Sequence, residues 1–148
     1  MFKTIVVGID GSGPSQNAVR MACDLAGKYD STLALVHTPQ PQTVAFALGA
    51  MAGYHAVTTM PDPDEVKRAA AKVMDAASAI AAEAGVTITA QASEQGDPAT
   101  QIVAMADDTG ADLIVMGRRG LGGVGALFMG STSQDVAHKA KCAMLTVA

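Results

Sequence analysis

Short apolar runs alternate with helical segments along the whole of this 148-residue chain. The runs are rich in β-branched residues, as strands buried on both faces of a sheet are. We expect strands at residues 4–9, 32–37, 86–92, 112–116 and 143–147. The segments between them predict helices from Pro14 to about residue 27, over 62–84, over 98–108 and over about 132–140. Such alternation predicts one α/β domain over residues 1–148, with a mainly parallel sheet and helices on both faces.

One stretch breaks the alternation. Residues 39–61 are bracketed by Pro39 and Pro61, carry almost no charge and include several large apolar side chains. A loop of more than about 15 residues is uncommon in a compact domain. We therefore expect a long connection, part of which folds against a surface that the sequence does not identify.

Composition excludes several classes of protein. The formal net charge of −4 argues against a general nucleic-acid binder. No apolar run reaches the 18 or so residues of a membrane-spanning helix, and the N-terminal residues lack the features of a signal peptide. We expect a cytoplasmic protein that does not enter a membrane, with Cys23 and Cys142 as two buried free thiols.

Six of the fifteen glycines lie within residues 117–130, and Ser131, Thr132 and Ser133 follow them. Glycines at this density let backbone N–H groups approach a ligand without side chains in the way. The helix expected next adds free amides and a partial positive charge at its start. This segment therefore predicts a phosphate cradle, and hence a bound nucleotide.

Two common phosphate motifs do not account for this segment. No G-x-x-x-x-G-K-[ST] sequence is present, so there is no P-loop lysine. Gly120, Gly122 and Gly125 match G-x-G-x-x-G, but the helix begins later, and no second strand ending in an acidic residue follows. We therefore reject a dinucleotide fingerprint.

Polar and glycine residues follow three of the expected strands, at Asp10-Gly11-Ser12, at His37-Thr38 and from Gly117 onward. Ligands of open α/β sheets bind beyond the carboxyl ends of strands, where strand order reverses. If the first and fourth strands are neighbours, Asp10 and Gly117 face one crevice. Asp10 is then the only carboxylate expected in it.

Each of these features also has a purely structural interpretation. Asp10 could be a turn former, and residues 131–133 could be helix caps, with Gln134 or Asp135 completing a capping box. Arg118 and Arg119 could be a solvated pair instead of phosphate ligands. His37, at a strand end, is expected to be structural and not catalytic.

The spacing Gly117-x2-Gly120-x9-Gly130-Ser131 resembles the ATP-binding signature of the universal stress protein family. The resemblance extends over the whole chain, including Ile9-Asp10-Gly11-Ser12, Leu35-Val36-His37 and Gly96-Asp97-Pro98. It implies a five-stranded sheet in the order 3-2-1-4-5, usually in a dimer, and binding of ATP. Where many members carry a histidine, this chain has Arg119, and its role is left open.

By position, the resemblance places Asp10 near adenine and ribose, and Thr38 where a main-chain contact to adenine is made. It places Gly117, Gly120, Gly130, Ser131 and Ser133 on ribose and phosphate. The candidate site as a whole comprises Asp10, Gly11, Ser12, Thr38, Gly117, Arg118, Arg119, Gly120, Gly130, Ser131, Thr132 and Ser133.

We expect a regulatory module that binds ATP, with Mg²⁺ as an optional companion, and that acts on an unidentified protein partner. The strand at 143–147 is short, apolar and expected at a sheet edge, where two copies can pair into a homodimer. The alternatives are a slow ATPase or phosphotransferase, and an interaction protein that binds no nucleotide. No general base for an enzyme is evident in the sequence.

Overall fold

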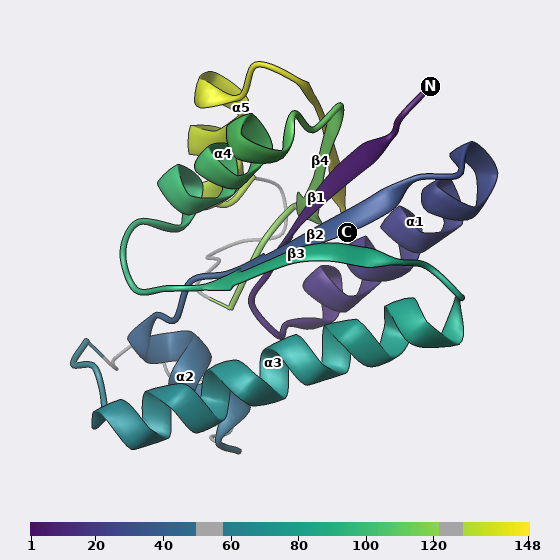
Figure 1. The fold of residues 1–148 in the computed structure, drawn as a ribbon. Helices are drawn as coiled ribbons and strands as arrows, with labels where there is room; N and C mark the ends of the chain where they lie inside the picture. The colour runs from purple at the N-terminus through teal and green to yellow at the C-terminus, as the bar shows by residue number, and fades with distance from the viewer. Residues whose placement is uncertain (50–57, 122–128) are drawn as a thin grey trace.

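Five parallel strands form one sheet in the order β3-β2-β1-β4-β5, and helices cover both of its faces (Figure 1). The computed structural model describes residues 1–49, 58–121 and 129–148. Along the chain the elements are β1 (Thr4–Ile9), α1 (Gly13–Tyr29), β2 (Thr32–His37), α2 (Pro41–Ala47), α3 (Pro63–Glu83), β3 (Ile88–Ser93), α4 (Pro98–Thr109), β4 (Leu113–Gly117), α5 (Ser131–Lys139) and β5 (Ala143–Val147). The predicted fold class and strand order are confirmed.

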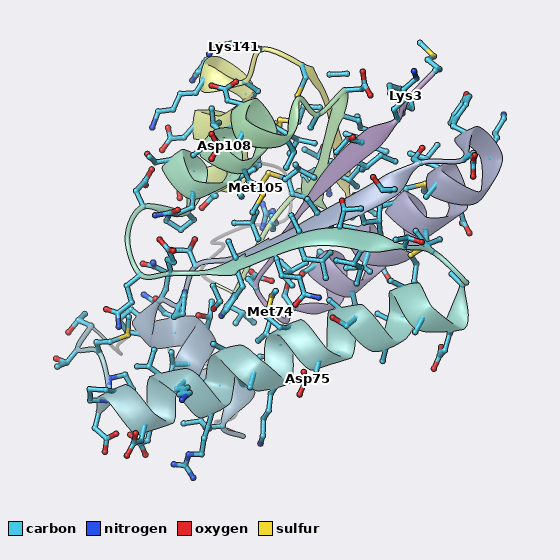
Figure 2. All side chains as sticks on the ribbon, in the orientation of Figure 1. Lys3, Met74, Asp75, Met105, Asp108 and Lys141 are labelled. Carbon is cyan, nitrogen blue, oxygen red and sulfur yellow. The ribbon has the colours of Figure 1, made fainter. Side chains whose placement is uncertain are left out.

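The strand pleat divides the core between the two faces of the sheet. Along β1, Ile5 and Val7 pack with α1 and α3, whereas Val6 packs on the other face with α4 and α5. Figure 2 shows Met74 on the α3 side and Met105 on the α4 side. Burying one such aliphatic side chain stabilises the fold by about 1.5–3 kcal/mol. The sheet is therefore held from both faces.

Three helices begin with the same arrangement, a capping side chain followed by proline in the first turn. Ser12 caps α1, Asp62 caps α3 and Asp97 caps α4, each through a hydrogen bond from a first-turn amide. Proline fits there because its missing N–H would have no partner inside the helix. Each cap is worth about 1 kcal/mol. The caps of α1 and α4 fix where the chain turns after β1 and β3.

The stretch 39–61 is not one long loop, because it contains α2. Pro41 starts this helix, and the side chain of Thr43 closes a capping box with Gln40. Val44 is fully buried and packs against Val66 of α3. The expectation that part of this stretch folds is thus confirmed, but α2 itself is not among the helices expected from the sequence. Residues 50–57 lie outside the described part of the chain.

Two smaller expectations also need correction. β3 begins at Ile88 and not at 86, because the Val86 N–H bonds back to the carbonyl of Ala81 in the last turn of α3. Cys23 is buried as expected, but Cys142 is only partly buried, and both thiols are free. No helix in the described ranges is long and apolar enough to cross a membrane.

His37 at the end of β2 is structural, as expected. Its ring is 1% exposed, and Nδ1 lies 2.9 Å from the carbonyl oxygen of Ile9, so Nδ1–H is the donor. Burial lowers the pKa of His37, and the Ile9 carbonyl and the Asp10 charge only partly oppose this effect. The folded protein therefore holds this imidazole in its neutral form near pH 7.

Because His37 is buried in its neutral form, we expect the protein to lose stability at a pH well above the range in which carboxylates titrate. A depressed imidazole pKa gives stability that is full above the unfolded value of about 6.5 and is lost as the pH falls toward the folded value. We expect the free energy of unfolding in urea to drop between pH 7.5 and pH 5.5. In His37→Asn the same pH interval should have little effect, and an equal slope in both proteins would assign the drop to other groups.

Candidate functional site

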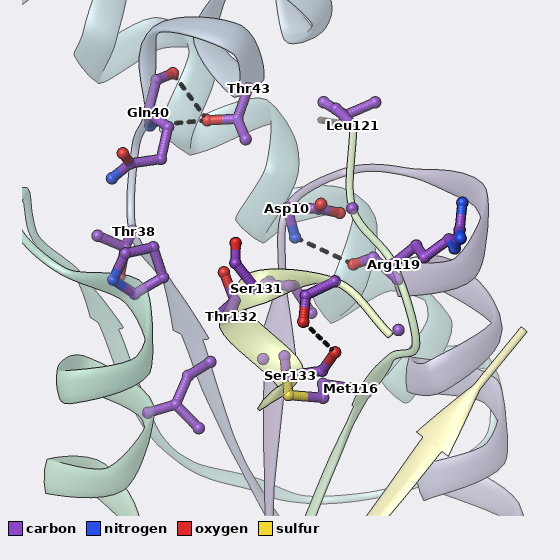
Figure 3. Close-up of a pocket in the computed structure, with 18 of the residues that line it drawn as sticks. Asp10, Thr38, Gln40, Thr43, Met116, Arg119, Leu121, Ser131, Thr132 and Ser133 are labelled. Carbon is purple, nitrogen blue, oxygen red and sulfur yellow. Dashed lines mark hydrogen bonds between the residues drawn. The ribbon is translucent and has the colours of Figure 1, made fainter. Parts of the chain in front are cut away.

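A cavity of about 600 Å³ lies beyond the carboxyl ends of β1 and β4 (Figure 3). The chain runs outward from β1 through β2 to β3 and then returns to β4, so strand order reverses at the β1–β4 pair. Open α/β sheets bind ligands at this kind of position. Asp10 and Gly117 both line the cavity, so the predicted crevice between them is present.

The floor of the cavity contains Gly8 of β1, Val36 of β2, Met116 of β4 and Ile102 of α4. Gly8 is buried near the carboxyl end of β1, and a β-carbon there would lie 2.7 Å from Cδ1 of Ile102. The missing side chain of Gly8 is thus replaced by one that reaches over from α4. The floor is apolar and belongs to the core that α4 shares with the sheet.

Asp10 is held at the rim by its neighbours. Its Oδ1 accepts hydrogen bonds from the backbone N–H and the hydroxyl of Ser12, at 2.9 and 2.6 Å. Its own N–H donates to the hydroxyl of Ser15 at 3.1 Å (Figure 3). Its Oδ2 lies against Gly120, where a β-carbon would overlap it. Asp10 is therefore the turn former that its sequence context allowed, and its carboxylate also lines the cavity.

Backbone contacts of Arg118 tie the glycine segment to two other elements. The Arg118 N–H donates to the carbonyl of Val147 in β5 at 2.6 Å. The Arg118 carbonyl accepts from the N–H of Gly130 at 2.9 Å and from the hydroxyl of Ser133 at 3.0 Å. Both ends of the segment are thereby fixed against each other, next to the last strand.

α5 begins at the cavity without a capping side chain. Its N-cap residue is Gly130, and among the described residues no side chain caps the helix. The hydroxyl of Ser133 donates instead to the carbonyls of Arg118 and Gly130. The alternative that residues 131–133 serve as helix caps is therefore wrong. Figure 3 shows Ser131, Thr132 and Ser133 together at this end of the helix, where the helix dipole favours an anion.

Most of the predicted site residues line this cavity, and three do not. Asp10, Thr38, Gly117, Arg119, Gly120, Gly130, Ser131, Thr132 and Ser133 are among the lining residues. Ser12 is buried beneath Asp10 as the cap of α1, and Gly11 faces Val73 in a smaller cavity on the α3 side. The Arg118 residue is exposed. The part of the glycine loop at 122–128, with Gly122 and Gly125, lies outside the described residues.

Sequence reasoning missed one wall of the cavity. Gln40, Gln42 and Thr43 from the start of α2 line it, together with Asp97 at the start of α4. The Gln40 amide Nε2 donates to the carbonyl of Gly96 at 3.0 Å, which joins these two segments. The sequence signal that could have identified this wall is the turn at Gly96-Asp97-Pro98 directly after a strand, because ligands of such sheets bind beyond strand ends.

Asp10 is not the only carboxylate in the cavity, because Asp97 and Asp135 also line it. Hydrogen bonds from the hydroxyl and the N–H of Thr100 lower the pKa of Asp97, and the Lys139 amine 3.8 Å away adds to the effect. Asp97 is thus a weaker base than an ordinary aspartate. A general base that works near neutral pH needs the opposite shift.

Comparisons with known proteins place the chain in a family. A sequence model of the universal stress protein family matches residues 1–148. The universal stress protein in the QAH/OAS sulfhydrylase 3′ region of Thermus aquaticus is 37% identical over 147 residues, which cover 99% of each chain.

Solved structures agree with this assignment. A universal stress protein in complex with cAMP is 28% identical, with a TM-score of 0.69, over 99% of this chain and 97% of that chain. The universal stress protein of Archaeoglobus fulgidus in complex with dAMP is 22% identical, with a TM-score of 0.70, over 99% of this chain and 98% of that chain. At 22% identity the second likeness shows the fold alone.

Proposed function

The chain belongs to the universal stress protein family, and on that premise we propose that it binds an adenine nucleotide in the larger cavity. The observation that carries the proposal is the start of α5, which opens on this cavity with no side-chain cap from the described part of the chain. The first amides of a helix have no acceptor inside it, and a phosphate group supplies one. The negative charge of the phosphate also matches the helix dipole.

The class of ligand follows from relatives. Structures of similar proteins contain cAMP and dAMP, which share an adenine base and one phosphate group. In this chain, the anion would occupy the amides of residues 131–133, beside Gly130. The nucleoside would extend across β1 toward β2, above the apolar floor. The glycine spacing from Gly117 to Gly130 and the position of Arg119 at the cavity favour ATP within this class, with Mg²⁺ as its companion ion.

We propose that the nucleotide is bound and not turned over. Hydrolysis needs a group that activates or positions the attacking water. Among the cavity carboxylates, Asp10 is occupied by two hydrogen bonds from Ser12, Asp97 has a lowered pKa, and Asp135 is exposed on α5. His37 is bonded to the Ile9 carbonyl and does not line the cavity. The role is then regulatory, in the cytoplasm, through a homodimer that presents its nucleotide state to a protein partner.

Calorimetry on the purified chain tests both statements. We expect AMP, cAMP and ATP to bind, and GMP to bind at least tenfold more weakly. The same preparation should hydrolyse ATP far below the 1–100 per second of ordinary phosphoryl-transfer enzymes. A folded protein that binds none of the three adenine nucleotides would contradict the proposal and favour the interaction protein. Fast hydrolysis that is lost in Gly130→Val would instead establish an ATPase, since a contaminant would not respond to that variant.

A further inference from the structure

The smaller cavity, of about 220 Å³, lies among α1, α2 and α3, on the face of the sheet that α1 and α3 cover. Its walls are apolar: Ile9 ends β1, Val19 comes from α1, and Val73 and Ala77 come from α3, and all four are buried. An apolar cavity of about 150 Å³ is large enough to bind benzene. This cavity therefore has room for a ring with a short substituent.

The turn after β1 separates the smaller cavity from the larger one. Asp10 lines only the larger cavity and Gly11 only the smaller one, whereas Ile9 and Ser15 line both. Gly11 has a φ of +85°, and a β-carbon there would lie 3.1 Å from Cγ2 of Val73, so the turn packs closely on α3. A ligand of the smaller cavity would thus lie behind this turn and leave the larger cavity free.

Three exposed residues form the mouth of the smaller cavity. Gln16 comes from α1, Phe46 from α2 and Lys72 from α3. Phe46 is 39% exposed, so an aromatic side chain meets water at the edge of an apolar cavity. A ligand with an apolar body would remove both this ring and the cavity walls from water, which favours binding.

The charge at the mouth selects among apolar ligands. Of the described residues that line the smaller cavity, only Lys72 carries a charge, and in the described ranges it forms no ion pair. Figure 2 shows the nearby Asp75 on the side of α3 that faces away from the sheet, and this carboxylate does not line the cavity. The Gln16 amide offers a further donor. The mouth therefore favours an anionic group with hydrogen-bond acceptors.

We propose that the smaller cavity binds a small carboxylate with a compact apolar body. The body would lie among Val19, Val73 and Ala77, and the carboxylate would remain at the mouth beside Lys72, where water still reaches it. A charged group is costly inside apolar walls, so this orientation is the favourable one. The inference goes beyond the proposed function and does not depend on it, because the start of α5 takes no part in this site.

The test uses phenylacetate and its neutral analogue phenylacetamide, with NMR of the side-chain methyl groups of the protein. Phenylacetate should bind with a dissociation constant on the order of 1 mM, as suits so small a ligand. The methyl signals of Val73 and Ala77 should shift, while those of Ile102 and Met116 in the larger cavity stay unchanged. Phenylacetamide should bind about two- to fivefold more weakly, since an exposed ion pair contributes little. In Lys72→Met the two compounds should bind equally.

A matched pair of variants on α3 locates the site. Ala76 and Ala79 are both exposed, but only Ala76 lines the smaller cavity. Ala76→Leu should weaken the binding of both compounds at least tenfold by steric exclusion, and Ala79→Leu should leave it unchanged. Unchanged binding in Ala76→Leu, or shifts at Ile102 in place of Val73, would overturn the site. Equal affinities of the two compounds for the unaltered protein would overturn the assignment of a carboxylate.

Discussion

Gly130→Val is expected to lower the affinity for AMP at least tenfold, while the free energy of unfolding changes by about 1 kcal/mol or less. At Gly130 the backbone φ of −65° suits any residue, and a β-carbon would meet no atom of the described residues closer than 3.5 Å. The protein itself therefore has room for a side chain here. An anion at the first amides of α5 would not leave that room, because the side chain would occupy its path. Valine is a poorer N-cap than glycine, which accounts for the small change in stability.

Gly117 provides the matched control for this variant. A β-carbon at Gly117 would lie 2.8 Å from the carbonyl oxygen of Arg119 and 3.1 Å from Cβ of Pro14, so the backbone must move. Gly117→Ala should lose AMP binding and also about 1–3 kcal/mol of stability. Calorimetry together with urea unfolding separates a glycine needed for the ligand from one needed for packing. Undiminished AMP affinity in a folded Gly130→Val protein would remove the start of α5 from the site.

Thr146→Pro is expected to convert a dimer at micromolar concentration into a monomer. β5 lies at the sheet edge, as predicted, and its pairing with a second copy is our proposal. The Val147 carbonyl accepts from Arg118 and therefore faces inward, along the ladder with β4. Because the peptide groups of successive residues alternate in direction, Leu145 also faces β4, whereas Met144 and Thr146 face outward. Proline at 146 removes an outward donor and places its ring in the partner's position.

Leu145, which neighbours Thr146 and faces β4, provides the control variant for Thr146→Pro. Leu145→Pro removes a donor to β4 and should lower the stability of each protomer, in addition to any effect on assembly. Thr146→Pro should leave urea unfolding of the protomer nearly unchanged, because edge strands tolerate proline. Light scattering measures the mass of each protein. An unaltered chain that is monomeric at micromolar concentration, or a dimer that persists in Thr146→Pro, would contradict pairing through β5.

The residues at strand ends were predictable because strand periodicity and turn chemistry are local properties. Asp10 and Gly117 could be brought to one crevice from the resemblance and the expected strand order alone. The wall formed by Gln40, Gln42 and Thr43 was not predictable in this way. It depends on a seven-residue helix whose stability comes from packing of Val44 against α3, and short apolar stretches do not reveal such packing.

The roles of particular polar atoms also could not be predicted from the sequence. Serine after glycine at the start of a helix ordinarily predicts a cap, yet the Ser133 hydroxyl donates to two carbonyls, and no side chain of the described residues caps α5. The helix expected over 98–108 is present as α4, but the sequence does not reveal that Asp97, which caps α4, also lines the cavity. These outcomes depend on segments that are distant along the chain and meet only in the folded protein.

The arrangement at Gly8 gives this fold a way to change its ligand preference in evolution. At Gly8 the side chain that forms the floor comes from Ile102 on α4, while β1 contributes only backbone there. Substitutions at one helix position can therefore deepen or raise the floor without altering strand pairing or the hydrogen bonds of β1. Selectivity for different small molecules can diverge among descendants of such a chain while the sheet that supports them stays the same.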